Sequence, residues 1–261
     1  MGGALPVGKQ MIFTAQNTWK EIEEAKVRVA VVPIGSTEQH GTHLPLTTDT
    51  LIAEKFAQVV AEKLGAYLTP AIPIGQSAMW LEFPGSLSFS AATMQAVITD
   101  IVDSLVKTGF DTILFVSIHG ANEVVYRGFP ESLQPKYPGV KILTVGYPTW
   151  VRPNWATIWR QAVKDAGLPE MIHADEAETS LVLALRPDLV GPNPTDCPLP
   201  ANQYPPGKTL RQVYPSGTMG YGSRASKEKG ARLWAAVLRL AMEDLQKQYP
   251  DLFKPAADRN L

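Results

Sequence analysis

The chain has 261 residues, of which 45% are hydrophobic and 19% are charged, and its formal net charge is −1. This length suffices for one large domain or two small ones with an ample core, and the composition is ordinary for a globular protein. Because no excess of positive charge is present, we do not expect binding to nucleic acid or to an anionic membrane surface.

The single cysteine, Cys197, excludes an internal disulfide and favours the reducing cytoplasm as the location of the protein. The first residues, MGGALPVGKQMIFTAQ, lack a basic end followed by an apolar run, so no signal peptide is expected. No run of about 18 apolar residues occurs, so no transmembrane helix is expected either.

Apolar runs and helical patterns alternate along the chain. In chain order the sequence predicts a strand at 27–35, a helix at 50–65, a strand at 66–75, a helix at 91–109, strands at 111–120 and 140–147, and helices at 175–187 and 226–249. Continuous Val/Ile/Leu strands that alternate with helices predict a parallel sheet covered on both faces. We treat residues 1–261 as a single domain.

The segment 191–224 departs from this alternation. It contains seven prolines and five glycines in 34 residues, together with Tyr204, Tyr214 and Tyr221. A linker is one interpretation. The tyrosines favour an ordered loop near the site or in an oligomer contact, because loops this long within a compact domain usually have a function or are disordered.

The stretch GSTEQHGTHLPLTTDT, residues 35–50, is typical of a metal site. Glu38 and His40 follow the first strand and His119 ends the third, so topology brings them to the carboxyl edge of the sheet, where ligands bind. Glu38 and His40 are two residues apart, so both side chains of an extended segment point the same way. Asp49 has two carboxylate oxygens, which suits a bridge between two ions about 3.5–4 Å apart.

Glu178 and His173 are expected at the same site. On its helix, Glu178 shares a face with Leu181, Val182 and Leu185, so its carboxylate is predicted to be buried. A buried charge needs a partner, because desolvation alone costs several kcal/mol, and a metal ion is such a partner. His173, just before this helix, is then placed to act as an acid or a base.

Each of these residues also has an ordinary structural interpretation. His43 is more often a loop residue than a ligand, Asp49 is equally suited to cap the helix at 50–65, and His119 resembles a satisfied core histidine beside a glycine turn. His173 suits a helix entry, and Glu178 suits a pair with an arginine. Taken together, however, these interpretations require four histidines to cluster by accident. Neither a Walker loop nor a G-x-G-x-x-G or G-x-S-x-G motif is present, which argues against nucleotide binding and a serine hydrolase.

The same motifs resemble those of the creatininase (creatinine amidohydrolase) family. The resemblance begins with PIGSTEQHGTHLPLTTDT and continues, in order, through FPGSLSF, HGAN, HADEAETSLVLALRPDLV and ASKEKGARL, over about residues 18–249. It implies a three-layer α/β/α sandwich with a mainly parallel sheet, two divalent metal ions per subunit and a homo-oligomer, often a hexamer.

By the same resemblance, the metal ligands are Glu38, His40, the bridging Asp49 and His119, with Glu178 as a further ligand. The pair of ions, zinc, manganese or iron, activates a water that attacks a carbonyl. His173 is the candidate acid that protonates the leaving nitrogen, and it forms the catalytic pair together with Glu178.

Departures from the family pattern concern the substrate. Creatinine-hydrolysing members carry a tyrosine and a glutamate where this chain has Gly120 and Ala121, and a closing tryptophan is not found near Leu168 and Pro169. The glutamate is a metal ligand in those members, so its absence gives Glu178 more weight. Creatinine is therefore not the favoured substrate.

The substrate-binding residues are expected to be Trp80, Glu82 and Asn122. Many relatives have a histidine shortly before F-P-G, where Trp80 and Glu82 stand here, and Asn122 belongs to the HGAN motif. Trp150 and Trp155 are further candidates for lining the pocket.

The leading hypothesis is a metal-dependent hydrolase that acts on a small cyclic amide or related ring. Alternatives with the same site are the ring-opening of an inositol-derived cyclic diketone (the 3-dehydro-scyllo-inosose type) and the removal of formyl groups from amines. A metal-free relative that only binds a small molecule is disfavoured, because a buried charged cluster is costly unless it is used.

Overall fold

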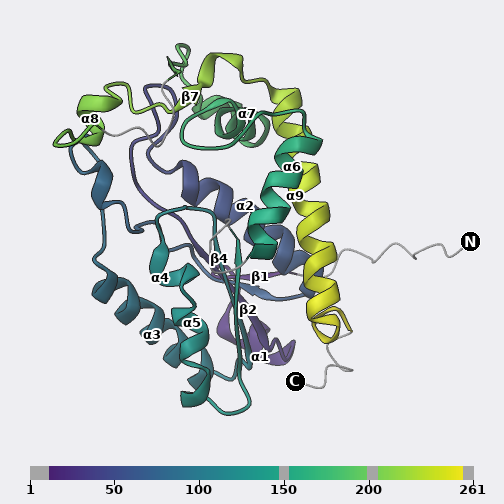
Figure 1. The fold of residues 1–261 in the computed structure, drawn as a ribbon. Coiled ribbons are helices and arrows are strands. Elements are labelled where there is room, and N and C mark those ends of the chain that lie inside the picture. The colour runs from purple at the N-terminus through teal and green to yellow at the C-terminus, as the bar shows by residue number, and fades with distance from the viewer. Residues whose placement is uncertain (1–11, 147–152, 199–204, 255–261) are drawn as a thin grey trace, which may run out of the picture.

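The computed structural model describes residues 12–146, 153–198 and 205–254, and a five-stranded parallel sheet lies at its centre (Figure 1). The sheet has the strand order β1-β3-β2-β4-β5. Its strands are β1 (Phe13–Thr14), β2 (Val29–Ile34), β3 (Tyr67–Leu68), β4 (Thr112–Ser117) and β5 (Lys141–Gly146). A separate two-stranded antiparallel sheet pairs β6 (Asp196–Cys197) with β7 (Gly220–Tyr221).

Helices cover both faces of the five-stranded sheet. They are α1 (Trp19–Glu24), α2 (Thr48–Leu64), α3 (Ala91–Lys107), α4 (Glu123–Tyr126), α5 (Phe129–Ser132), α6 (Pro153–Asp165), α7 (Glu176–Leu185), α8 (Leu210–Val213) and α9 (Lys227–Gln248). Short 3-10 turns complete the described chain at 78–80, 134–136, 187–189, 222–224 and 250–253.

The side chains of the central strands alternate between two apolar cores. On β2, Val29 and Val31 pack with helices α2, α6, α7 and α9, whereas Ala30, Val32 and Ile34 pack with α3, α4 and α5. In Figure 1, α6 and α9 accordingly lie on one side of the sheet, and α3, α4 and α5 on the other. The predicted α/β fold, a three-layer sandwich with a parallel sheet, is therefore confirmed.

The three longest strands end level with one another. β2 pairs with β4 from Val29 opposite Thr112 to Ile34 opposite Ser117, and β4 pairs with β5 up to Gly146 opposite Ser117. The segments that follow β2 and β4 therefore leave the sheet at the same carboxyl edge, which positions the site.

Among the predicted strands, the one at 66–75 differs most from the observed structure. The strand predicted at 66–75 is regular only at Tyr67–Leu68, although Ile72 still pairs with Ile34 as an isolated bridge. Pro70 and Pro73 interrupt the ladder because proline has no N–H to donate. Helix α6 was not among the predicted elements. No helix of the described segments is long and apolar enough to span a bilayer.

Candidate metal centre

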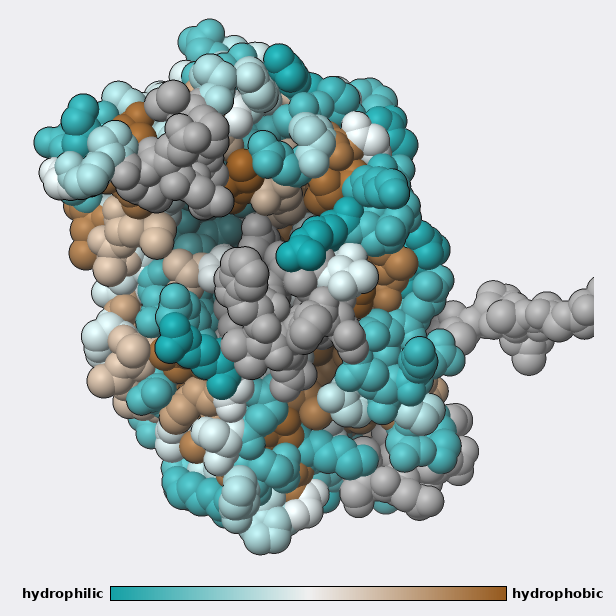
Figure 2. Space-filling view, viewed as in Figure 1, coloured by the Kyte–Doolittle hydropathy of each residue, from teal (hydrophilic) through white to brown (hydrophobic). Residues whose placement is uncertain are grey.

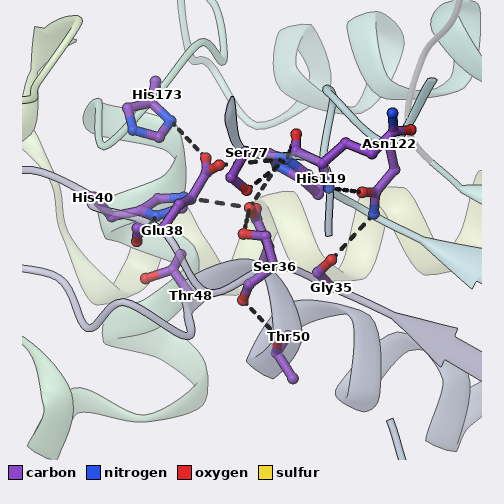
Figure 3. A network of polar contacts seen from close by, with 12 residues as sticks. Gly35, Ser36, Glu38, His40, Thr48, Thr50, Ser77, His119, Asn122 and His173 are labelled. Atoms are coloured by element: carbon purple, nitrogen blue, oxygen red, sulfur yellow. Dashed lines mark hydrogen bonds and ion pairs between the residues drawn. The ribbon is translucent and has the colours of Figure 1, made fainter. Parts of the chain in front are cut away.

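Three carboxylates and three imidazoles converge beside the carboxyl edge of the sheet. Figure 3 shows four of these residues, Glu38, His40, His119 and His173, with their side chains directed toward one another. Their ligand atoms form three overlapping groups, in each of which all atoms lie within 4.8 Å of one another. The groups are Glu38 with His40 and His173, Glu38 with Asp49 and His119, and His40 with Asp49 and Glu178. The structure thus brings together all six residues predicted as metal ligands or as the acid, from three distant segments. Their roles remain predictions.

The loop after β2 is held against the start of α2. Gly35 lies so close to this helix that an added Cβ would stand 2.3 Å from the Cα of Thr50, so only glycine fits. The Thr50 hydroxyl donates to the carbonyl of Ser36 at 2.8 Å. This close contact places the loop that carries Glu38 and His40 directly over the helix end that carries Asp49.

Asp49 lies at the centre of the cluster and does not cap its helix. The residue preceding α2 is Thr47, which makes no side-chain capping bond, and Asp49 lies in the first turn. Its Oδ2 accepts from the Ser36 hydroxyl at 2.7 Å and lies 2.8 Å from His119 Nδ1, while Oδ1 lies 3.6 Å from His40 Nε2. Its two oxygens therefore face two different ligand groups, as a bridging carboxylate requires.

The rings of His40 and His119 are each oriented by a backbone carbonyl. His40 Nδ1 lies 3.2 Å from the carbonyl of Glu38, which leaves Nε2 facing the cluster. His119 Nε2 lies 3.1 Å from the carbonyl of Gln76, which leaves Nδ1 facing Asp49. An imidazole that donates one N–H to a carbonyl and presents the other nitrogen is the usual arrangement of a metal-ligating histidine.

Glu178 is fixed by the turn that begins α7. The side chain of Asp175 caps this helix by accepting from the backbone N–H groups of Ala177 and Glu178. Ala174 adopts a left-handed φ of 48°, and its N–H donates to Glu178 Oε2 at 2.5 Å. This strained conformation, unusual for alanine, points the Glu178 carboxylate to within 3.8 Å of His40 Nε2. The prediction that this carboxylate is buried is confirmed, with 4% of the residue exposed.

His173 lies between two rings and is hydrogen-bonded on its far side. Its ring stacks on Trp80 at 4.3 Å and lies 4.4 Å from the ring of His40. Its Nε2 is 2.9 Å from the Gln39 carbonyl and 2.8 Å from the Gln39 amide nitrogen, so this atom has a partner whether it donates or accepts. Nδ1 faces Glu38 at 3.8 Å and is therefore the nitrogen directed at the cluster.

The carboxylates and imidazoles strongly perturb one another. Burial alone would lower the pKa of His40, but Asp49, Glu178 and Glu38 raise it to about 10. Burial likewise opposes the charged form of His119, yet Glu38 and Asp49 raise its pKa to about 9. With only these partners, both imidazoles hold a proton that a metal ion would have to displace.

Among the three acids, burial dominates the pKa of Glu178 and Glu38 but not that of Asp49. Burial raises the pKa of Glu178 to about 8 and that of Glu38 to about 7. For Asp49, burial would raise the pKa, but His40 and His119 hold it well below its usual value.

For His173, burial and the neighbouring His40 hold the pKa well below 6.5, so its ring is neutral.

The donor set fits divalent cations. Among the described residues, Glu38 Oε2 and His40 Nε2 are buried and make no hydrogen bond, although both point into the cluster. Buried polar atoms without partners are rare, and a bound cation would satisfy both. Carboxylate oxygens and imidazole nitrogens are ligands for zinc, manganese and iron.

A cavity of about 330 Å³ opens onto the cluster. It is bounded by Glu38, Asp49, His119, His173 and Glu178, which we call the polar floor. It is also bounded by Met79, Trp80, Ile118, Ile172 and Met219, which we call the apolar wall. The other described residues that line it are Gly120, Ala121 and Glu123.

The three predicted substrate-binding residues are placed differently from one another. Trp80 lines the cavity, but it is 3% exposed and its ring covers His173. Glu82 is exposed and is not part of the cavity lining. Asn122 is fully buried and is hydrogen-bonded to Gly35, Ser117 and Gln76, so it ties the strand ends together behind the site.

His43 lies outside the three ligand groups. Its Nε2 lies 2.8 Å from the Thr179 hydroxyl, beside Glu178, and its carbonyl accepts from Gly191. The predicted role as a loop residue fits this position better than the role of a ligand. Trp150 lies outside the described residues, as does the side chain of Trp155.

The segment 191–224 reaches the site in its described part. Met219 donates its N–H to the carbonyl of His173 at 2.9 Å, and the Gly217 carbonyl accepts from the Gln39 side chain at 3.1 Å. Tyr214 is fully buried, Tyr221 lies under Arg224, and Tyr204 lies outside the described residues.

Contacts that hold the ligands went unpredicted. Gln39, Gln76 and Ser36 each contact one of the six clustered residues. Gln39 and Ser36 lie in the loop after β2 that carries Glu38 and His40, so their position beside the predicted ligands was the available signal. No such signal marked Gln76, whose carbonyl meets a histidine 43 residues away in the sequence.

Comparison with known proteins finds the family that the sequence motifs resemble. The sequence model of the family described as creatinine amidohydrolase matches residues 15–245. Creatinine amidohydrolase of Pseudomonas putida is 28% identical over 258 residues, covering 92% of this chain and 98% of the relative. Mycofactocin precursor peptide peptidase of Mycolicibacterium smegmatis is 29% identical, covering 86% and 87%. A 3-dehydro-scyllo-inosose hydrolase of Thermotoga maritima is 23% identical, covering 95% and 88%.

Solved structures agree with the sequence relatives. A crystal structure of creatinine amidohydrolase superposes with a TM-score of 0.76 at 26% identity, covering 93% of this chain and 99% of that one. Similar solved creatininases include a Zn–Zn form and a manganese form.

Proposed function

The chain belongs to the creatininase family of hydrolases, and we propose that it uses two divalent ions to hydrolyse the C–N bond of a small cyclic amide or a related ring compound. The observation that carries this proposal is the overlap of the ligand groups, in which Glu38 and Asp49 are each shared by two groups. Shared carboxylates are what a pair of adjacent cations requires.

Five residues would hold the cations. Asp49 would bridge them, Glu38 and His119 would bind on one side, and His40 and Glu178 on the other, following the grouping of their atoms. The three carboxylates supply three negative charges when ionised, which offsets most of the charge of two divalent ions. A pair of divalent cations lowers the pKa of a water molecule and polarises a carbonyl group.

His173 would carry the proton in the reaction. It lines the cavity, and its Nδ1 faces the cluster while Nε2 stays bonded to Gln39 in either protonation state. A ring held in this way can take a proton from the attacking water and deliver it to the leaving nitrogen without reorienting. Trp80 holds the ring flat against this position.

A second candidate reaction uses the same residues on another bond. The similarity to a 3-dehydro-scyllo-inosose hydrolase favours the ring-opening of an inositol-derived cyclic diketone. Hydrolysis of formamides is a third variant of the same chemistry. Creatinine is disfavoured because Gly120 and Ala121 line the cavity where creatinine-hydrolysing members carry a tyrosine and a glutamate.

The identity of the metal ions, the oligomeric state and the location of the enzyme are part of the same proposal. The ions are zinc, manganese or iron, and the Zn–Zn and manganese forms of similar creatininases support the first two. We expect a homo-oligomer, a hexamer by analogy with the family, that works in the cytoplasm on a small molecule.

The test is a substrate panel on protein loaded with each metal in turn. The panel covers creatinine, other lactams, formamides, linear peptide amides and cyclic diketones. We expect metal-dependent turnover of a lactam or another small amide, and little turnover of creatinine. Turnover of the diketone alone would favour the second candidate. Turnover that persists after chelation, checked by metal analysis, would contradict the proposal.

A further inference from the structure

The apolar wall stands directly beside the polar floor. Ile118 precedes His119 and Ile172 precedes His173, so the same backbone segments supply both surfaces. Met219 is tied to His173 by the backbone bond between them. The wall is therefore fixed relative to the cluster, and whatever reacts at the floor lies against it.

Met79 distinguishes this wall from ordinary core. Ile118, Trp80 and Met219 are buried, but Met79 is 54% exposed although it lines the cavity. Leaving a long apolar side chain in water forfeits stabilisation unless something covers it. In the described residues, three of the four exposed large apolar side chains, Met79, Leu81 and Leu87, come from one segment.

This segment is anchored to the loop that carries the candidate ligands. The Leu87 N–H donates to the Thr37 carbonyl at 2.8 Å, and the Ser86 hydroxyl accepts from the Gln39 N–H at 3.0 Å. Figure 2 shows tan and brown atoms along the edge of the molecule over the chain between β3 and α3. Of these three exposed side chains, Met79 alone lines the cavity, so it is the one placed to contact a bound molecule.

From this arrangement we propose that the substrate carries an alkyl or similarly apolar group next to the scissile carbonyl, and that Met79 selects for it. The proposal rests on the function proposed above and narrows its substrate class from small cyclic amides and related compounds to those that carry an apolar substituent. The cavity has room for roughly ten non-hydrogen atoms, which accommodates a carbonyl group and a short chain.

The test measures binding, so that it does not depend on turnover. Straight-chain alkyl hydroxamates of two to six carbons, whose head group chelates metals, are titrated into the metal-loaded protein by calorimetry. We expect Kd to fall by about fourfold for each added methylene until the cavity is full.

Two variants of equally exposed residues make the test specific. Met79→Ser is expected to raise the Kd of the six-carbon hydroxamate by about tenfold and to reduce the dependence of Kd on chain length. Leu81→Ser changes a side chain of 55% exposure outside the lining and is expected to bind like the wild type.

The outcomes separate the two proposals. If Kd does not depend on chain length, or if both variants behave like the wild type, the apolar selection is wrong even when amides are hydrolysed. If hydroxamates show the expected dependence but no amide on the panel is hydrolysed, the apolar selection stands and the proposed reaction is wrong.

Discussion

The polar floor and the apolar wall of the cavity are made from neighbouring residues but obey opposite rules. The floor gathers side chains that are costly to bury unless hydrogen-bonding or charged partners satisfy them. The wall gathers side chains that gain from burial, yet its outermost member, Met79, is left half exposed. The difference indicates that the floor determines which bond reacts and the wall determines which molecule is bound.

The largest effect is expected from breaking the floor. His40→Asn keeps a group near Nδ1 and removes Nε2, which makes no hydrogen bond and faces the carboxylates of Asp49 and Glu178. We expect turnover to fall by about a thousandfold or more, because a metal pair supplies several kcal/mol of transition-state stabilisation. Steady-state kinetics at saturating metal measures this loss.

His43→Asn is the matched control, because His43 is also buried but lies in none of the ligand groups. Losing its bond to Thr179 should lower the free energy of unfolding by about 1–3 kcal/mol and reduce turnover by less than about tenfold. Equal losses of turnover in the two variants would show that the distinction between the ligand groups and their surroundings is wrong.

A smaller effect is expected at Trp80, which belongs to the wall but acts on the floor. Trp80→Leu removes the ring stacked on His173. Because an aromatic pair contributes about 0.5–1.5 kcal/mol beyond its buried area, we expect kcat to fall by about tenfold. Rates on substrates with short and long alkyl groups should fall by the same factor.

That uniform loss would set Trp80 apart from Met79. Substitution of Met79 should affect substrates with long alkyl groups most, because it changes the binding surface and not the position of His173. If Trp80→Leu discriminates by chain length as strongly as Met79→Ser, Trp80 is a substrate-binding residue, as the sequence had suggested.

Sequence reasoning located the floor well because topology and burial are encoded locally. The strands at 27–35 and 111–120 both end at the carboxyl edge, where the loop with Glu38 and His40 begins. The apolar spacing around Glu178 indicates its burial. The sequence could not decide whether Asp49 caps a helix or binds a metal, because both roles place an acid at the start of α2. The structure was needed to distinguish them.

The wall and the supporting contacts were not predictable in the same way. Gln39 meets Gly217 across 178 residues, and no local pattern records such a pair. Glu82 and Asn122 were assigned to substrate binding from their position near motifs, but Glu82 is exposed and Asn122 is buried behind the site.

Helix α6, which the sequence analysis missed, was predictable, because Ile158, Trp159, Ala162 and Val163 recur at helical spacing.

The most direct test of the central claim is the number of metal ions per chain in the wild type and in two variants, measured by elemental analysis after metal loading and removal of free metal. Sharing of Asp49 between two cations predicts two ions in the wild type, none in Asp49→Ala and one in Glu178→Ala. A wild type without metal, or an Asp49→Ala protein that retains both ions, would contradict the account.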